Sequence, residues 1–446
     1  MTKDLTVGKP RKLILSFTLP LLAGNIFQQL YAFVDTLIVG RFLGVEALAA
    51  VGCTGSLMFL MIGFITGLTT GFTIYTGQRF GAKDEEGVRR SVAACGILSA
   101  ISSVVLTAGG VLLCGSFLAW MQTPAEILAD ARAFITIVYG GIGAGLFFLL
   151  QTNLLRALGD SRTPTVLLAI GLSLNIILEP IFILVLGLGI PGAAMATVAA
   201  QLLGNVITFL YILKKVPALR TSRHHWQVDR KLLWQHLRMG LPMGFQASII
   251  AIGAIILQVA LNQLGPLAVA AYAAAQKVDA IAVMPMMSFG MTMAAYTAQN
   301  YGARAFNRIH EGVRQGILLS GSFSILAGAF NIMCGPWIME LFVGPEAPQV
   351  VSYGHIYLGV NGVCYFILAL LFIYRFTLQG LGKTAVPTVA GIMELIMRTA
   401  AAVFLVDIFG YLGACLANPL AWLGSCIPLF IAYCWERRYL RERTAN

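Results

Sequence analysis

YTGQRFGAK at residues 75–83 and YTAQNYGAR at residues 296–304 are two versions of one stretch of sequence. Other pairs recur in the same order, at an offset of roughly 220 residues. They are Leu19-Pro20 with Leu241-Pro242, LGVEALAA from Leu43 with LGPLAVAA from Leu264, LGDSRTPTV from Leu158 with LGKTAVPTV from Leu381, and GAAMAT from Gly192 with GACLAN from Gly413. An unchanged order at a fixed offset indicates an internal duplication. The chain therefore consists of two related halves.

The composition is that of a membrane protein. Of the 446 residues, 58% are hydrophobic and 11% are charged, whereas a soluble domain has about 25% charged residues. A membrane-spanning helix needs about 20 apolar residues. Twelve such runs are predicted to be helices: Leu13–Gly40, Ala47–Thr76, Ser91–Met121, Ala131–Leu155, Thr165–Leu186, Gly192–Leu213, Gly240–Asn262, Ala268–Ala298, Gly316–Phe342, Val350–Leu378, Pro387–Ile408 and Gly413–Cys434.

The number of runs sets the expected architecture. Six runs fall in each half, so each half begins and ends on the same side of the membrane and the halves are parallel repeats. We expect an all-α integral membrane protein of twelve transmembrane helices, in two six-helix lobes related by a pseudo-twofold axis along the membrane normal. The N-lobe is predicted at 1–213 and the C-lobe, with a short cytoplasmic tail, at 240–446. The polar stretch 214–239 is expected to be a cytoplasmic linker, too short for a core of its own.

The net charge of +11 comes from basic residues concentrated in alternate loops. These include 79–90, 214–238, 437–443 and the pair Arg375 and Lys383. Basic loops stay in the cytoplasm, so both termini are predicted to be cytoplasmic and the membrane to be the cell (inner) membrane. The charge is thereby explained by topology, which argues against nucleic-acid binding. All eight cysteines lie in or beside apolar runs without paired spacing, so we expect neither disulfides nor a metal site.

The stretch LSLNIILEPIF, residues 172–182, carries a carboxylate inside an apolar run. An ionised group there is costly unless paired or hydrated, so intramembrane acids are candidates for function. Asn175 precedes Glu179 by four residues and lies on the same helix face. Pro180 donates no N–H, which frees the carbonyl of Ile176 and predicts a bend. A carboxylate, an amide and a free carbonyl oxygen suit a proton or a small hard cation.

A second acid, Asp35, lies in the first expected helix. Gln28 and Tyr31 precede it at helical spacing and complete a polar stripe. Pro20 is predicted to bend the same helix about four turns earlier. A further polar stripe in the expected helix 192–213 consists of Thr197, Gln201 and Asn205.

Several motifs resemble those of the MATE family, the multidrug and toxic compound extrusion transporters, in its prokaryotic form. They are YAFVDTLIVGRFLG from Tyr31, TGQRFGA from Thr76, LLRALGD from Leu154 and LNIILEPIF from Leu174. Together with the repeat, the resemblance covers nearly the whole chain. It implies an antiporter that exports organic cations and other drugs by alternating access in exchange for H⁺ or Na⁺, with no further cofactor.

The resemblance also implies site residues. Asp35, Asn175, Glu179 and Thr197 match positions that form the cation or proton site in the first lobe of prokaryotic members. Many relatives have Asp where this chain has Glu179. The side chains expected to line the substrate cavity are those of Gln28, Tyr31, Asn153 and Gln201.

The second lobe departs from one branch of the family, because the expected helices 240–262 and 350–378 contain no acid. It does contain Lys277 and Asp279, and Glu394 with Arg398. Glu394 and Arg398 are four residues apart and can pair on one helix face. A structural ion pair and a role in substrate binding or gating both remain open for this C-lobe network.

Three other classes of protein fit the sequence less well. A flippase for lipid-linked oligosaccharides would need several basic groups for its phosphate cargo, and only Lys277 and Arg398 qualify. An integral membrane enzyme would need a clustered catalytic constellation, and none is present at useful spacing. A receptor or scaffold would not need duplicated lobes with intramembrane acids. We therefore expect a transporter of small organic cations, monomeric in the lipid bilayer, that is not an enzyme.

Overall fold

The computed structural model describes residues 3–121, 123–344 and 347–445. Within these ranges the chain is almost entirely helical, with short turns between the helices and no strand. The contacts divide it into two compact units. Unit 1 contains Pro20–Gly244 together with the residues before Leu5, and unit 2 contains Leu5–Leu19 and everything from Phe245 onward.

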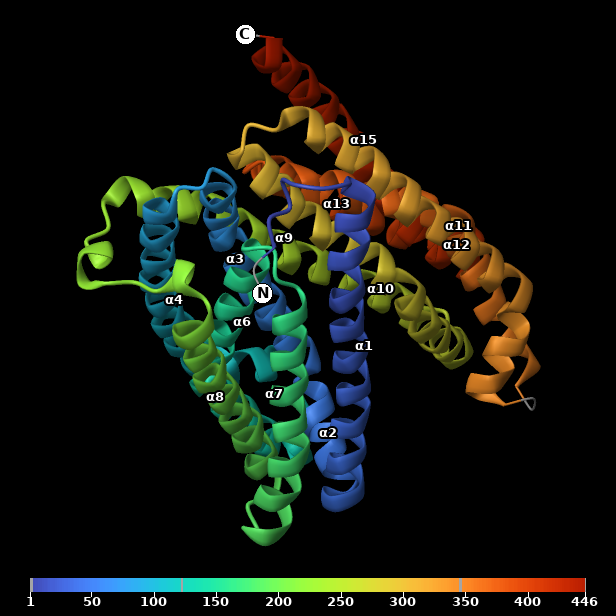
Figure 1. Cartoon of the computed structure of the whole chain (residues 1–446). Helices are drawn as coiled ribbons and strands as arrows, with labels where there is room; N and C mark the ends of the chain where they lie inside the picture. Colours follow the sequence, from blue (N-terminus) through green and yellow to red (C-terminus); the bar gives the residue numbers. More distant parts are fainter. Residues whose placement is uncertain (1–2, 122, 345–346, 446) are drawn as a thin grey trace. The chain divides into compact units, whose positions relative to one another are not determined.

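Unit 1 holds the helices of the first repeat. They are α1 (Pro10–Leu43, of which unit 1 includes the part from Pro20), α2 (Val45–Cys53), α3 (Gly55–Gly81), α4 (Glu85–Trp120), α5 (Ala125–Gly140), α6 (Ile142–Ala157), α7 (Arg162–Pro180), the π-helical turn η1 (Ile181–Val185), α8 (Gly189–Lys215) and the 3₁₀ turns η2 (Pro217–Leu219) and η3 (Arg223–Trp226). α4, α6, α7 and α8 run side by side (Figure 1), with α6 packed on both α4 and α8 and α7 packed on α8.

Unit 2 holds the helices of the second repeat. They are α9 (Arg230–Gln263, of which unit 2 includes the part from Phe245), α10 (Pro266–Gly302), α11 (Phe306–Val343), α12 (Pro348–Gly380), α13 (Ala385–Ala400), the π-helical turn η4 (Ala401–Leu405), α14 (Val406–Phe409) and α15 (Tyr411–Ala445). α12 is its central helix, in contact with α10, α11 and α15. The core of unit 2 contains fully buried side chains of α12, such as those of Tyr357, Leu358 and Tyr365.

The all-α membrane fold is confirmed, with one correction to the expected helices. Among the described residues, eleven helices are long and apolar enough to span a membrane, or up to twelve if the bent pair α5 and α6 forms one span. The predicted single helix 131–155 is this pair, which bends by 46° at Gly140-Gly141. A Cβ atom on Gly141 would lie 2.4 Å from Val198 of α8. The glycine pair therefore both permits the bend and lets α8 approach closely.

In each repeat, the equivalent helix is interrupted by a π-helical turn. α7 passes directly into η1 after Pro180, and α13 passes directly into η4 after Ala400. Pro180 has no N–H to donate, which accounts for the change of hydrogen bonding in the first repeat. The second repeat changes at the corresponding place without a proline. The interruption is thus a property of the duplicated fold rather than of the proline alone.

The start of each half packs beside the loop that joins the second and third helices of the other half. In unit 2, the Leu5 N–H donates to Gln299 Oε1 at 2.9 Å, and Thr18 Oγ1 lies 2.8 Å from Thr292 Oγ1. In unit 1, His236 Nε2 of α9 lies 2.8 Å from Ser91 Oγ of α4. Leu5–Leu19 therefore belong to unit 2 and the predicted linker 214–239 to unit 1. The lobe boundaries at 213 and 240 stay a prediction.

Within unit 1, α3 and the first part of α9 cross with their backbones in contact. Gly67 and Gly71 of α3 face Gly240 and Gly244 of α9, four residues apart on each helix. A Cβ atom added at Gly71 would lie 2.5 Å from Gly240 Cα, and one at Gly67 would lie 2.3 Å from the Met243 carbonyl oxygen. Paired small residues at this spacing let membrane helices pack closely.

Gly71→Ala is therefore expected to destabilise the protein by about 1–3 kcal/mol, because the new methyl group meets backbone that cannot move aside. The matched control is Gly109→Ala on α4, where an added Cβ meets nothing within 4 Å. That control should be neutral or stabilising by up to about 1 kcal/mol through helix propensity. Thermal unfolding of both purified variants in detergent measures the difference, and equal stability would contradict backbone contact between α3 and α9.

Candidate functional site

Two carboxylates from different helices meet in unit 1. Asp35 lies on α1, half-buried, and Tyr31 one turn earlier donates its hydroxyl hydrogen to Asp35 Oδ1 at 3.1 Å. Glu179 lies in the last turn of α7, beside η1, and only 1% of it is exposed. Asp35 and Glu179 lie close enough for their charges to interact, and Tyr31 interacts with both.

The neighbouring polar groups leave acceptor oxygens free. Asn175 Nδ2 donates to Thr197 Oγ1 of α8 at 3.2 Å, and Thr197 Oγ1 donates to the Ala193 carbonyl at 3.1 Å. Asn175 Oδ1 and both carboxylate oxygens of Glu179 are buried and accept no hydrogen bond from any described residue. The four residues implied by the resemblance, Asp35, Asn175, Glu179 and Thr197, thus occur in one place, and the groups left without partners there are all acceptors.

The electrostatics of this acidic pair follow from its surroundings. Neither Asp35 nor Glu179 forms a salt bridge within the described ranges of the chain. Two ionised carboxylates repel each other, and burying them without a counter-charge costs several kcal/mol per ion. A proton on one acid or a bound cation relieves this repulsion and lowers the cost of burial. The chemistry of the acidic pair is therefore that of a site which accepts positive charge.

The residues predicted to line a substrate cavity are more dispersed. Tyr31 lies at the acidic pair, whereas Gln28, about one turn before it on α1, is exposed. Gln201 on α8 is half-buried, and its Oε1 lies 3.0 Å from where a Cβ of Gly145 would be. Asn153 is buried on α6 and takes part in a hydrogen-bonded contact with α3.

Asn153 holds α6 against α3. Its Nδ2 donates to Thr69 Oγ1 at 3.1 Å and to Thr70 Oγ1 at 3.3 Å, and its Oδ1 accepts from Arg156 Nη1 at 3.1 Å. All of its hydrogen-bonding groups are therefore occupied by helix packing. Sequence alone could not distinguish this arrangement from a cavity-lining amide, because both place a polar residue on the inner face of a helix.

An apolar groove lies between α1 and α7. It has a volume of about 450 Å³ and is lined by Phe27 of α1 and by Thr165, Val166, Ala169, Ile170, Ser173, Leu174 and Ile177 of α7. Pro20 lies at one end of this contact, where its carbonyl oxygen accepts a hydrogen bond from Thr165 Oγ1 at 2.8 Å. α1 runs through Pro20 without a break.

In unit 2, Asp279 and Lys277 do not pair. Asp279 on α10 is buried and accepts hydrogen bonds from the hydroxyls of Tyr365 at 2.6 Å and Tyr357 at 3.4 Å, both on α12. Lys277 is exposed. Two residues apart on a helix, the two side chains point to different faces. The predicted C-lobe network therefore separates into a tyrosine-bound carboxylate and an ionic group around Glu394.

Glu394 on α13 lies between two arginines. Arg398 Nη2 donates to Glu394 Oε1 at 3.1 Å, and Arg375 Nη2 of α12 donates to Glu394 Oε2 at 2.8 Å and to Ser425 Oγ at 3.1 Å. All three charged side chains are at least nine-tenths buried. The i, i+4 pair was predicted, but the assignment of Arg375 to a basic loop was wrong, because it lies inside α12. The position of Arg375 inside the apolar run 350–378 already indicated that it lies in a helix.

A duplicated bundle of apolar helices of spanning length defines a multi-pass membrane protein. The MatE family model matches the chain twice, over residues 20–181 and 242–404. The protein belongs to the MatE family. The double match is also the duplication seen in the sequence, and it confirms the resemblance to the MATE transporters.

Known relatives match nearly the full length of the chain. It is 28% identical over 440 residues to "Probable multidrug resistance protein YoeA" of Bacillus subtilis, covering 95% of this chain and 94% of that protein. It is 22% identical over 459 residues to "Probable multidrug resistance protein NorM" of Thermotoga maritima, covering 98% and 96%. A crystal structure of MATE in the bent conformation matches with a TM-score of 0.90 and 24% identity, covering 99% of this chain and 98% of that chain.

Proposed function

We propose that this protein is a cation-coupled multidrug efflux antiporter, which exports organic cations and other drugs by alternating access in exchange for H⁺ or Na⁺. The observation that carries the proposal is the pair of the half-buried Asp35 and the buried Glu179, whose carboxylates have no basic partner among the described residues. Such a pair takes up a proton, a sodium ion or a cationic substrate, each of which supplies the missing positive charge.

Competition for the acidic pair supplies the coupling. A cationic drug and the coupling ion both bind best when the other is absent, because two positive ligands near one cluster repel each other. By linkage, the ion then lowers drug affinity by the same factor by which the drug lowers ion affinity. Ion entry from outside releases drug, and ion loss to the cytoplasm restores the drug-binding state. No other cofactor is required for this cycle.

The membrane and the topology belong to the same proposal. The alternation of basic loops supports both termini in the cytoplasm and insertion in the cell membrane. The names of the relatives support small-molecule drugs as the substrate class. Exchange of this kind needs one chain only, and we propose a monomer that binds no nucleic acid.

The test is efflux of a fluorescent organic cation from proteoliposomes under one imposed gradient at a time. A pH gradient, acidic on the external side, is applied without sodium, and a sodium gradient is then applied at a single pH. We expect one of the two gradients to drive drug movement and drug to drive movement of that ion in return. Drug movement that is independent of both gradients would refute ion coupling, and ion-driven movement of a phosphorylated lipid instead of the drug would favour the flippase.

The flippase alternative is not favoured by the arrangement of the basic groups. Arg398 and Arg375 both bind Glu394. A phosphate cargo would have to compete with that carboxylate for the guanidinium groups. Lys277 is the remaining intramembrane candidate of the predicted network, and a single ammonium offers a point charge rather than a bidentate phosphate site.

A further inference from the structure

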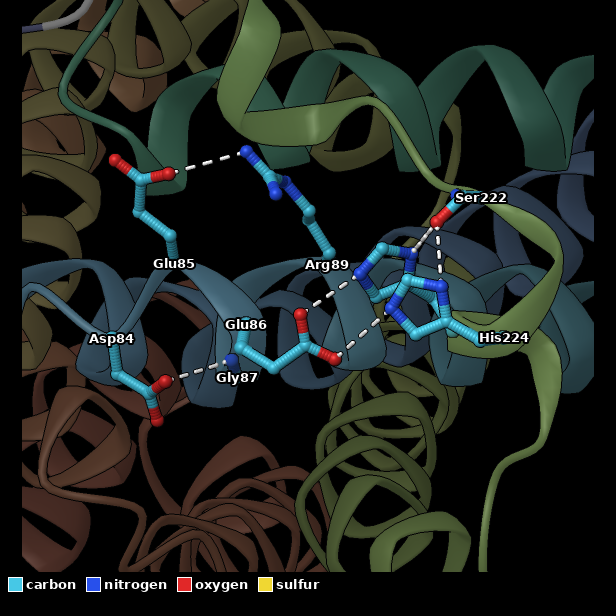
Figure 2. A network of polar contacts seen from close by, with 8 residues as sticks. Asp84, Glu85, Glu86, Gly87, Arg89, Ser222 and His224 are labelled. Carbon is cyan, nitrogen blue, oxygen red and sulfur yellow. Dashed lines mark hydrogen bonds and ion pairs between the residues drawn. The ribbon is translucent and has the colours of Figure 1, made fainter.

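Three potential metal ligands come together in unit 1, away from the acidic pair. Glu86 lies in the first turn of α4, and His224 and His225 lie in η3, within the predicted linker. Glu86 Oε1 is 3.5 Å from His224 Nε2, and Glu86 Oε2 is 3.0 Å from His225 Nε2. One ligand atom from each of the three residues lies within 4.8 Å of the other two. Figure 2 shows the Glu86 carboxylate turned toward the two imidazole rings.

From this cluster we propose that Glu86, His224 and His225 bind a divalent transition-metal ion of the zinc class, which fastens the linker to the start of α4. A zinc ion with bonds of about 2.0–2.1 Å in tetrahedral geometry separates its ligand atoms by about 3.3 Å. The two Glu86 distances, 3.5 Å from Oε1 and 3.0 Å from Oε2, lie on either side of that value but involve different oxygens, so one oxygen has to turn toward both nitrogens to ligate the ion. Two nitrogens and one oxygen exclude Ca²⁺ and Mg²⁺, which take oxygen ligands.

The rings are held in a position suited to such an ion. The imidazoles of His224 and His225 lie side by side, with centroids 3.8 Å apart. Ser222 Oγ lies 2.9 Å from His224 Nδ1 and 2.7 Å from His225 Nδ1. Ser222 Oγ accepts from the Nδ1–H of His224, which leaves His224 Nε2 unprotonated for the metal, whereas His225 Nδ1 accepts from the Ser222 backbone N–H at 2.9 Å. A hydrogen-bond acceptor behind a ligating histidine orients the ring and fixes its tautomer in this way.

The surrounding charges leave Glu86 available. Arg89, one turn along α4, pairs with Glu85 at 3.1 Å. Arg79 pairs with Asp84 at 3.0 Å, and Asp84 caps α4 by accepting from the Gly87 N–H at 2.8 Å. The two other acids at this helix start are therefore engaged, and the partners of Glu86 are the two histidines. In Figure 2 each of the three acids at this helix start contacts a different partner.

The site is already assembled by contacts that do not involve the metal. His225 is 2% exposed, and Trp226 packs on α4, with ring atoms 3.2 Å from where a Cβ of Gly96 would be. Glu86 and His224 remain more than half exposed, so an ion and a water ligand can reach them. Three protein ligands with an open fourth position describe an exchangeable site rather than a closed structural one.

The equivalent junction in unit 2 uses different chemistry. There the segment before α1 is held by Arg308 of α11, whose Nη2 donates to the Gly8 carbonyl at 2.9 Å and whose Nε donates to Asn300 Oδ1 at 3.1 Å. No histidine takes part in these contacts of the described residues. The metal-ligand set is therefore a feature of the first repeat and not a requirement of the duplicated fold.

Without a metal, the same groups form an ordinary hydrogen bond. The Ser222 N–H, 2.9 Å from His225 Nδ1, then donates to that atom, and the Nε2–H of His225 donates to Glu86. Metal binding at Nε2 requires the proton of neutral His225 to move to Nδ1 and the Ser222 N–H to turn away from that atom. A titration with metal distinguishes the two states, because only the metal site binds one equivalent of the ion.

The test uses the full chain in detergent, purified with a tag that contains no histidine. Zn²⁺ is titrated against a chromophoric chelator, and Co²⁺ is used to record the visible absorption of a four-coordinate site. We expect one equivalent of metal per chain, with affinity lowered at least roughly 10–100-fold in Glu86→Gln and His224→Asn.

Glu85→Gln is the matched control, because Glu85 is the adjacent exposed glutamate and pairs with Arg89 instead. It should bind metal like the wild type. Zn²⁺ should raise the unfolding temperature of the wild type and of Glu85→Gln, but not that of Glu86→Gln or His224→Asn. Unfolding temperatures without metal show that each variant is folded. Absence of stoichiometric binding, or equal binding by all four proteins, would overturn the proposal and leave the hydrogen-bonded cluster.

Discussion

Glu179→Gln is expected to reduce ion-coupled drug efflux by roughly 5–150-fold, the typical range for loss of the coupling between two ligands. Glutamine keeps the volume of the side chain but holds neither a negative charge nor a titrating proton. Glu179 is 1% exposed and its carboxylate accepts no hydrogen bond from the described residues. Removing its charge should therefore not break a structural contact, and the variant should insert and fold.

The measurement is ion-driven drug efflux in proteoliposomes, with the unfolding temperature as a check on folding. Asp35→Asn should behave similarly, because it removes the other half of the pair. Equilibrium binding of a fluorescent cation should rise with pH in the wild type, since loss of protons leaves more negative charge for the drug. That dependence should flatten in Glu179→Gln. Wild-type efflux by both variants would refute the proposed ion site.

Glu126→Gln serves as the control for charge loss alone. Glu126 lies in the first turn of α5 and is exposed. Its replacement changes the net charge by the same amount without touching the pair, so efflux and its pH dependence should stay as in the wild type. If Glu126→Gln lost efflux equally, the effect would belong to net charge rather than to Glu179.

Glu394→Gln is expected to destabilise the protein by about 3–5 kcal/mol, which is the range for removing one partner of a buried ion pair. The substitution leaves Arg375 and Arg398 buried near each other without the carboxylate that both bind at 2.8 Å and 3.1 Å. Two guanidinium groups cannot lose their charge, so the repulsion has no relief. Thermal unfolding in detergent, followed by tryptophan fluorescence, should show a large fall in midpoint temperature.

Two comparisons separate this effect from a general sensitivity of unit 2. Glu340→Gln removes an exposed carboxylate from α11 and should change the stability by less than about 0.5 kcal/mol. The triple variant Arg375→Met, Glu394→Leu, Arg398→Met replaces all three charges by apolar side chains. It should restore much of the lost stability, because no charge is then left unpaired. A triple variant that is less stable than Glu394→Gln would contradict the account of unpaired arginines.

The sequence was sufficient for the fold class because the relevant signals are local. Apolar runs of spanning length and a repeat of motifs such as YTGQRFGAK and YTAQNYGAR are read directly along the chain. The same holds for the acids, since Asp35 and Glu179 stand out from apolar surroundings. The bend at Gly140-Gly141 was missed because the apolar run continues through it, and only the packing of Val198 on Gly141 distinguishes a bend from a straight helix.

The spacing of residues along the chain could not predict contacts between side chains of different helices. The i, i+4 pair of Glu394 and Arg398 was predicted, whereas the contact of Arg375 with Glu394 joins two helices. Asn153 had the sequence features of a cavity residue, yet its amide is fully bonded to Thr69, Thr70 and Arg156. In each case the sequence showed a polar residue in an apolar run, and only its contact partner showed which role the residue has.

The sequence by itself determined that this is a duplicated, all-helical membrane transporter of the MatE family with acids inside its first half. Hydrophobic length, loop charge and repeated motifs are properties of the chain that hold before any helix packs. The resemblance already placed Asp35 and Glu179 in one site, but only the tertiary structure decided that Glu394 meets Arg375 and that Glu86 meets His225. The physical reason is that side-chain pairing depends on distances of a few ångströms between helices, and helical periodicity specifies a face but not the neighbour that the face contacts.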